Sequence, residues 1–222
     1  MISEGTYEGT YIGTSGWHYD HWAGWFYPSG LPGEALLEHY AGCFSSAEIN
    51  NSFYRLPQKK TLLRWNDAVP DDFVFSVKAS RYLIHMKKFK DPEEPLARLL
   101  DRASVLADKL GPIIFQLPPR WRSNPGHLEG LLEILPEDQR YAFEYRDPSW
   151  FEEKNYALLS DHGASFCVYD LDGEALNTRR PTQRDASYAE GGHRAGSQPA
   201  RASGFLPALP PTRGGGVPTG KR

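Results

Sequence analysis

The chain has few cysteines and no long apolar run. Its 222 residues include only Cys43 and Cys167, and neither belongs to a CxxC motif or has a histidine at metal-binding spacing. This pattern gives no disulfide framework and fits a reducing cytosol, so we expect both to be small core residues. No stretch approaches the roughly 20 apolar residues that span a bilayer, and no apolar N-terminal segment resembles a signal peptide. We therefore expect a soluble, cytoplasmic protein with no membrane partner.

Most of the chain also lacks an excess of positive charge. From Arg179 onward there are eight Lys or Arg and two Asp or Glu, a net charge of +6, so the preceding residues carry −9. An acidic body argues against broad, non-specific nucleic-acid binding, which depends on neutralising phosphates. A local basic patch could still bind a phosphate-bearing partner.

What the sequence does contain is a regular alternation of hydrophobic runs and helical segments. With 40% hydrophobic and 13% aromatic residues, the chain can bury one full core. Alternation at a mean spacing of about 30 residues predicts βαβ units and a parallel sheet. The expected strands are residues 10–15, 46–49, 73–78, 113–117, 141–146 and 164–169, and the expected helices are 34–41, 57–68, 93–110, 126–135 and 149–159.

The pattern ends at about residue 177. Residues 179–222 contain 14 Gly or Pro and little periodicity, which is typical of disorder. We therefore predict a folded domain in residues 1–176 and a low-complexity, disordered tail in residues 177–222.

Polar and charged residues stand at the ends of the expected strands. Alternate side chains of a strand share a face, so Glu48 and Asn50 point together. A carboxylate on the buried side of a parallel strand is costly unless it is paired, and Lys78 on the next strand is the expected partner. This group is either a functional site or an ion pair that only fixes the fold.

In parallel α/β folds, ligands bind at the carboxyl ends of the strands. Two carboxylates near a lysine and an arginine can divide the acid and base roles, and the cations can hold an anionic group. The carboxylates could also bind a divalent ion, but we assign no metal ligands and no cofactor. We predict that Glu48, Lys78 and Glu144 are catalytic. The residues expected to bind substrate are Trp17, His18, Asn50, Tyr54, Arg81, His85, Gln116, Arg146 and Asp170.

Two loops add to this end of the sheet. The aromatic loop of residues 16–28 either forms a stacking wall over a ligand or plugs one end of the core, and its pair His18 and His21 is a weak metal signal. The loop of residues 79–90 is rich in cations. It is either a solvated face or a segment that recognises phosphate.

Ordered sequence blocks resemble the DUF72 (YecE-like) family over about residues 10–176. The blocks are residues 13–17 (GTSGW) with Trp22 and 26–28 (FYP), 48–50 (EIN) with 52–55 (SFYR), 75–78 (FSVK) with Arg81 and His85, 115–119 (FQLPP), and 143–146 (FEYR) with Ser149 and Trp150.

The resemblance implies a TIM-type (β/α) barrel and no established activity. The chain departs from the family at Ile84, where threonine is usual. Two further strands, one ending in an arginine and a His-Gly pair, have no counterpart after Thr178. We therefore expect an incomplete barrel of about six βα units, and hypothesise that the tail is a frameshifted or otherwise aberrant terminus.

Three functions fit the sequence. The first is an enzyme that acts on a phosphate-bearing or nucleic-acid substrate. The second is a module that binds a nucleotide or single-stranded nucleic acid without turnover. The third is an inactive truncated copy. The oligomeric state is not predicted.

Overall fold

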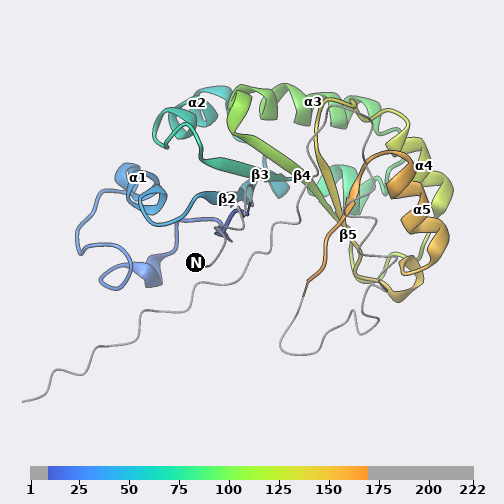
Figure 1. Ribbon diagram of the computed structural model, residues 1–222, viewed down its shortest axis with the longest axis horizontal. Helices are drawn as coiled ribbons and strands as arrows, with labels where there is room; N and C mark the ends of the chain where they lie inside the picture. The colour runs from blue at the N-terminus through green and yellow to red at the C-terminus, as the bar shows by residue number, and fades with distance from the viewer. Residues whose placement is uncertain (1–9, 170–222) are drawn as a thin grey trace, which may run out of the picture.

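The computed structural model describes residues 10–169, which form a single α/β unit (Figure 1). The strands are β1 (Gly13–Ser15), β2 (Ser46–Ile49), β3 (Val74–Lys78), β4 (Leu110–Gln116), β5 (Tyr141–Glu144) and β6 (Ser165–Phe166). The α-helices are α1 (Leu36–Ala41), α2 (Lys59–Asp67), α3 (Glu93–Ala103), α4 (Pro125–Leu132) and α5 (Glu153–Asp161). Shorter helical turns lie in the connections: η1 (Asp20–Trp22), η2 (Gly33–Ala35), η3 (Asn51–Phe53), η4 (Tyr82–Met86), η5 (Ser104–Lys109) and η6 (Pro148–Trp150).

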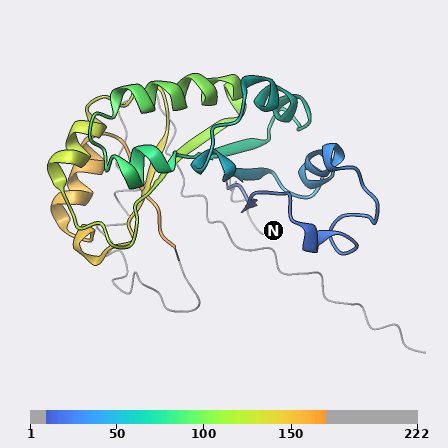
Figure 2. The ribbon, with the colours of Figure 1, turned by 180° about the vertical axis from the view of Figure 1, so that it is seen from behind.

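All six strands form one parallel sheet in the order β1-β2-β3-β4-β5-β6. The predicted α/β class is therefore confirmed. The sheet curves into an arch, and the α-helices lie along its outer side (Figures 1 and 2). Within residues 10–169, β1 and β6 do not pair with each other, so each is an edge strand. Closure into a TIM-type barrel stays a prediction.

The two faces of the sheet have different neighbours. Thr14 points toward the helices, where its hydroxyl donates to the Tyr40 hydroxyl of α1 at 2.9 Å. On the same side, Phe115 and Phe143 stack with ring centroids 4.8 Å apart in the core between sheet and helices. Because side chains alternate along a strand, Ser15, next to Thr14, points to the opposite, concave face.

The boundary between α3 and β4 differs from the prediction of one helix over residues 93–110 ended by Gly111. The helix α3 ends at Ala103, and Ala107 in η5 has a left-handed φ of 48°. Gly111 lies inside β4, where an added Cβ would sit 2.5 Å from Val74 Cγ1. The missing side chain lets β4 approach β3 and does not end a helix.

Two connections also differ from their predictions. The expected irregular loop of residues 79–90 contains the π-helix η4. The helix expected over residues 149–159 begins later, as α5 at Glu153, and Ser149 donates its backbone N–H and its hydroxyl to Asp147.

The remaining expectations concern the cysteines, a membrane-spanning helix and the tail. Cys43 is exposed, so its prediction as a core residue is wrong, and Cys167 is partly buried. In residues 10–169, no helix is long and apolar enough to cross a membrane. The predicted tail of residues 177–222 and the candidate Asp170 lie outside the described residues.

Candidate functional site

The strand ends bring several polar side chains to the concave face. Ser15, Glu48 and Ser76 are in register across β1, β2 and β3. Farther along the sheet, Lys78 of β3 is in register with Ile114 of β4, which shares a face with Gln116, and Gln116 is in register with Glu144 of β5. Side chains in register on neighbouring strands point to the same face, so these polar residues line one surface.

Glu48 is the most perturbed carboxyl of this surface. Only 7% of the residue is exposed, and one carboxyl oxygen accepts a hydrogen bond from the Ser15 hydroxyl at 2.7 Å. Burial raises the pKa of Glu48 above its ordinary value, because a charged carboxylate is poorly solvated there. Lys78 and the Ser15 hydrogen bond lower this pKa, and the negative charge of Glu144 raises it. The net direction is upward, which favours the neutral acid.

Lys78 lies two residues beyond Ser76 and therefore on the same face. The predicted ion pair between Lys78 and Glu48 is wrong for the described residues, since no carboxylate oxygen there lies within 4.0 Å of the Lys78 ammonium. The ammonium instead lies over the Phe53 ring, 5.5 Å from its centroid. Lys78 acts on Glu48 through space.

Glu144 has the opposite environment. Its two carboxyl oxygens each accept from the Gln116 amide at 3.0 Å, and Oε1 also forms an ion pair with Arg146. The Arg146 guanidinium lies over the Tyr169 ring, 4.2 Å from its centroid. Glu144 therefore has a cation and two hydrogen bonds that suit an ionised carboxylate, whereas Glu48 has one hydroxyl donor.

Cys167 follows β6 beside this group, and its backbone N–H donates to Phe143 O at 2.8 Å. Burial raises the pKa of the Cys167 thiol to about 12, with further contributions from Glu144, Glu48, Arg146 and Lys78. All four charged groups thus act on one thiol. Sequence reasoning missed Ser15, Ser76, Cys167 and Tyr169, although alternation from Glu48 and Glu144 across neighbouring strands would have indicated them.

Three buried polar atoms on or beside this surface have no hydrogen-bond partner within the described part of the chain. They are Ser76 Oγ, His85 Nε2 and Tyr169 OH. Buried polar atoms are normally hydrogen-bonded, so such a group calls for a partner from outside residues 10–169.

His85 stands at the edge of the site, with its ring centroid 5.0 Å from that of Phe53. Burial lowers the pKa of His85, and the nearby cations Arg81 and Lys78 lower it further. Asn50 is half-buried, whereas Tyr54 and Arg81 are exposed on the loops that follow β2 and β3. These candidate residues lie at the edge of the site and do not form a second site.

The aromatic loop lies mostly against the core. The Trp17 ring meets the Trp65 ring of α2 edge-on at 5.0 Å and lies 6.0 Å from Phe75 on the helix-facing side of the sheet. His18 is exposed. The geometry of Trp17 fits a plug, so its predicted contact with substrate gains no support. Among residues 10–169, no group of three or more His, Cys, Asp or Glu is arranged to hold a metal ion.

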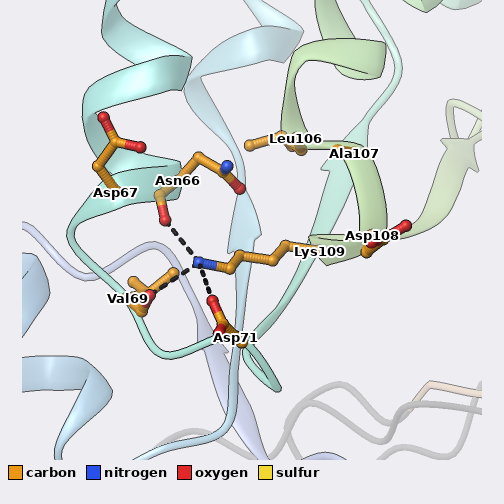
Figure 3. Close-up of a pocket in the computed structure, with 8 residues that line it drawn as sticks. All are labelled: Asn66, Asp67, Val69, Asp71, Leu106, Ala107, Asp108 and Lys109. Carbon is orange, nitrogen blue, oxygen red and sulfur yellow. Dashed lines mark hydrogen bonds and ion pairs between the residues drawn. The ribbon is translucent and has the colours of Figure 1, made fainter.

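A separate cavity of about 590 Å³ lies near the other ends of the strands, before β3 and β4 begin (Figure 3). The Lys109 ammonium reaches into it and donates to Asn66 O at 2.7 Å and Val69 O at 2.8 Å, with Asp71 Oδ1 at 3.6 Å. Its side chain is only 11% exposed. This lysine joins the end of α2 to the start of β4 and is distant along the strands from Glu48.

Several known proteins are similar to this chain. UPF0759 protein YecE of Escherichia coli (strain K12) is 29% identical over 177 residues, which cover 77% of this chain and 62% of YecE. UPF0759 protein YunF of Bacillus subtilis (strain 168) is 27% identical over 155 residues, covering 66% of this chain and 54% of YunF. The chain thus spans roughly three-fifths of the length of these relatives.

Solved structures agree with this relationship. A DUF72 family protein of Thermotoga maritima has a TM-score of 0.64 and 29% identity, with 72% of this chain and 65% of that chain covered. A DUF72 family protein of Enterococcus faecalis shares the fold, with a TM-score of 0.61 and 19% identity over 73% of this chain and 61% of that one.

The family model described as "Protein of unknown function DUF72" matches residues 11–203. This match runs past residue 176, where the resemblance drawn from motifs ends, and the frameshift hypothesis stays untested. Together with the similar proteins and the parallel sheet, it shows that the chain belongs to the DUF72 family.

Proposed function

We propose that the chain is an enzyme that performs acid–base chemistry on a phosphate-bearing substrate at the carboxyl ends of its strands. The observation that carries the proposal is the contrast between two buried carboxyls on one face. Glu48 has one hydroxyl donor and a raised pKa, and Glu144 has an arginine and an amide. Pairs of carboxyls whose environments differ in this way take separate acid and base roles.

Each residue of the site has a defined task in this proposal. For hydrolysis of a phosphate ester, neutral Glu48 donates its proton to the leaving oxygen, and Glu144 accepts a proton from the attacking water. Lys78 and the outer N–H groups of Arg146 bind the phosphate and offset its negative charge. Ser76 Oγ and Tyr169 OH, which have no hydrogen-bond partner within residues 10–169, supply further contacts to a polar ligand.

The test is a hydrolysis screen with phosphate monoesters and diesters, each assayed with and without added Mg²⁺. Glu48→Gln and Lys78→Met are the informative variants, and Glu38→Gln and Lys60→Met, at exposed helix positions, are matched controls. We expect turnover to fall by about 100-fold or more in Glu48→Gln, the usual size of a lost acid–base contribution. Wild-type rates in both informative variants would remove these residues from the mechanism.

A cytoplasmic location and a closed barrel are part of this proposal as predictions. Neither is needed for the chemistry assigned to Glu48 and Glu144.

A further inference from the structure

We infer that the loops after β2 and β3 form a binding surface for single-stranded nucleic acid, so that the substrate of the proposed site is a polymer. This inference rests on the proposed function, because it names the class of phosphate-bearing substrate. We call the surface the tyrosine rim. It consists of Tyr54, Tyr82 and Met86 with the cations Arg55, Arg81 and Lys88.

The rim contains three large side chains that are exposed to solvent. Tyr54 is 78% exposed, Tyr82 43% and Met86 68%. Single exposed apolar residues are common on proteins, but these three lie on two loops that contact each other. The Phe53 ring joins the loops, with its centroid 5.1 Å from Tyr54 and 5.0 Å from His85. The two loops that carry the rim residues are therefore in contact through Phe53.

The charge of the rim opposes that of the rest of the body. Residues 50–58 and 79–90 contain five Arg or Lys and no Asp or Glu, although the body before Arg179 carries −9. Among these cations, Lys87 pairs with Asp91 and lies 6.0 Å from the Tyr82 ring centroid. Arg55, Arg81 and Lys88 are exposed. Such a local concentration of cations provides the phosphate contacts that the acidic body lacks.

The backbone around Lys88 is anchored to the core. Lys88, Phe89 and Asp91 have left-handed φ angles of 51°, 62° and 43°, a conformation that non-glycine residues seldom adopt. Phe89 is 3% exposed and packs against Trp121 with ring centroids 4.9 Å apart. The Lys88 carbonyl lies 3.0 Å from His127 Nδ1. Because Phe89 and this contact anchor the segment, the backbone that carries Lys88 is held in place before a ligand arrives.

The rim is connected to the proposed catalytic site through the Phe53 ring. Lys78 lies over Phe53, the ring that also contacts Tyr54 and His85. A single-stranded nucleic acid whose bases stack on Tyr54 and Tyr82 would bring one of its phosphate groups to Lys78 and to the acid Glu48. Exposed aromatic rings stack on unpaired bases, whereas the faces of bases in a duplex are covered by their neighbours. The expected ligand is therefore single-stranded nucleic acid.

The experiment measures fluorescence anisotropy of labelled oligothymidine and oligouridine of about 15 nucleotides, the upper size of one such site. A duplex of equal length is the third probe. The full chain is compared with Tyr54→Ala/Tyr82→Ala and with Arg81→Ala/Lys88→Ala. Trp25→Ala, which removes a 63% exposed aromatic side chain outside the rim, is the matched control.

We expect both single strands or one of them to bind more tightly than the duplex. The double tyrosine variant should lose affinity by about 10-fold or more with an unchanged salt dependence, as expected for lost stacking. The double cation variant should bind less tightly and show a shallower salt dependence, by about 0.7 in the log–log slope for each lost phosphate contact. Trp25→Ala should bind like the wild type.

Three results would overturn the inference. They are a wild type that binds neither single strand in about 50 mM salt, tyrosine variants that bind like the wild type, and a preference for the duplex. The parallel assay with small phosphate esters separates this failure from failure of the proposed function. Turnover of small esters without oligonucleotide binding rejects the rim alone, and oligonucleotide binding without any turnover rejects the enzyme alone.

Discussion

At the residue scale, the protonation of Glu48 is the feature on which the proposed chemistry depends. Its pKa is raised by burial, and the lowering effects of Lys78 and Ser15 are smaller. A carboxyl with a raised folded-state pKa binds its proton more tightly when folded than when unfolded. Its contribution to stability is therefore complete below the ordinary value of 4.5 and is lost as the pH rises through the raised value.

Replacing Glu48 with glutamine tests whether the Glu48 carboxyl loses its stabilising effect as the pH rises. Glutamine keeps the shape and cannot ionise, so it mimics the neutral acid at every pH. We expect the free energy of unfolding of Glu48→Gln to increase relative to that of the wild type as the pH rises from 4.5 to 8, because only the wild type loses stability there; urea titration measures both. The exposed Glu38→Gln should show no such trend. A constant difference across this range would contradict a raised pKa.

The two cysteines should differ in reactivity. Cys43 is exposed, whereas the pKa of Cys167 is raised to about 12 by burial and by nearby carboxylates. The thiolate is the reactive form, so iodoacetamide at pH 8 should label Cys43 first and leave Cys167 largely unmodified. Peptide mass spectrometry after timed labelling measures both rates. Equal labelling would show that Cys167 does not lie in this environment.

At the scale of the element, the close approach of β4 to β3 depends on Gly111. A methyl group there would lie 2.5 Å from Val74 Cγ1 and 3.0 Å from Phe75 O, and the backbone oxygen cannot move cheaply. We expect Gly111→Ala to destabilise the protein by roughly 1–3 kcal/mol, the usual cost of overpacking.

Gly130 in α4 is the matched control, because nothing lies within 4 Å of its added Cβ. Gly130→Ala should be neutral or stabilising by up to about 1 kcal/mol, since alanine favours a helix. Thermal melts measure the stability of both variants. Equal changes in stability would mean that Gly111 does not set the spacing between β3 and β4.

Lys109 joins α2 to β4 through backbone carbonyls. Two carbonyls accept from its ammonium, so Lys109→Met would leave Asn66 O and Val69 O without this donor. We expect a loss of roughly 1–3 kcal/mol in the free energy of unfolding. Lys60→Met on the exposed side of α2 should change stability little, and a similar loss in both variants would show that the carbonyl contacts of Lys109 contribute nothing.

At the scale of the whole molecule, the sequence was sufficient for the class of fold and for the end of the sheet at which the polar candidate residues gather. The alternation of runs predicted six parallel strands, and β2 coincides with the predicted residues 46–49 because its apolar and polar side chains alternate cleanly. Two of the predicted site residues, Glu144 and Arg146, form an ion pair.

Other features depend on contacts that periodicity does not encode. The π-helix η4 escapes prediction because the cations that flank it, Arg81, Lys87 and Lys88, resemble a solvated loop, and Gly111 resembles a helix stop in sequence although it lies beside β3. The ion pair expected between Lys78 and Glu48 is absent from the described residues, because strand register places two side chains on a face without fixing their rotamers.

The most direct test of the account is a carbon NMR titration of the Glu48 carboxyl in the wild type, in Lys78→Met and in Glu144→Gln. We predict a wild-type pKa of Glu48 above 4.5, a higher pKa in Lys78→Met, which lacks the cation, and a lower pKa in Glu144→Gln, which lacks the second carboxylate. A Glu48 carboxyl that titrates at or below 4.5, or that is insensitive to both substitutions, would contradict a shared charged site at the strand ends.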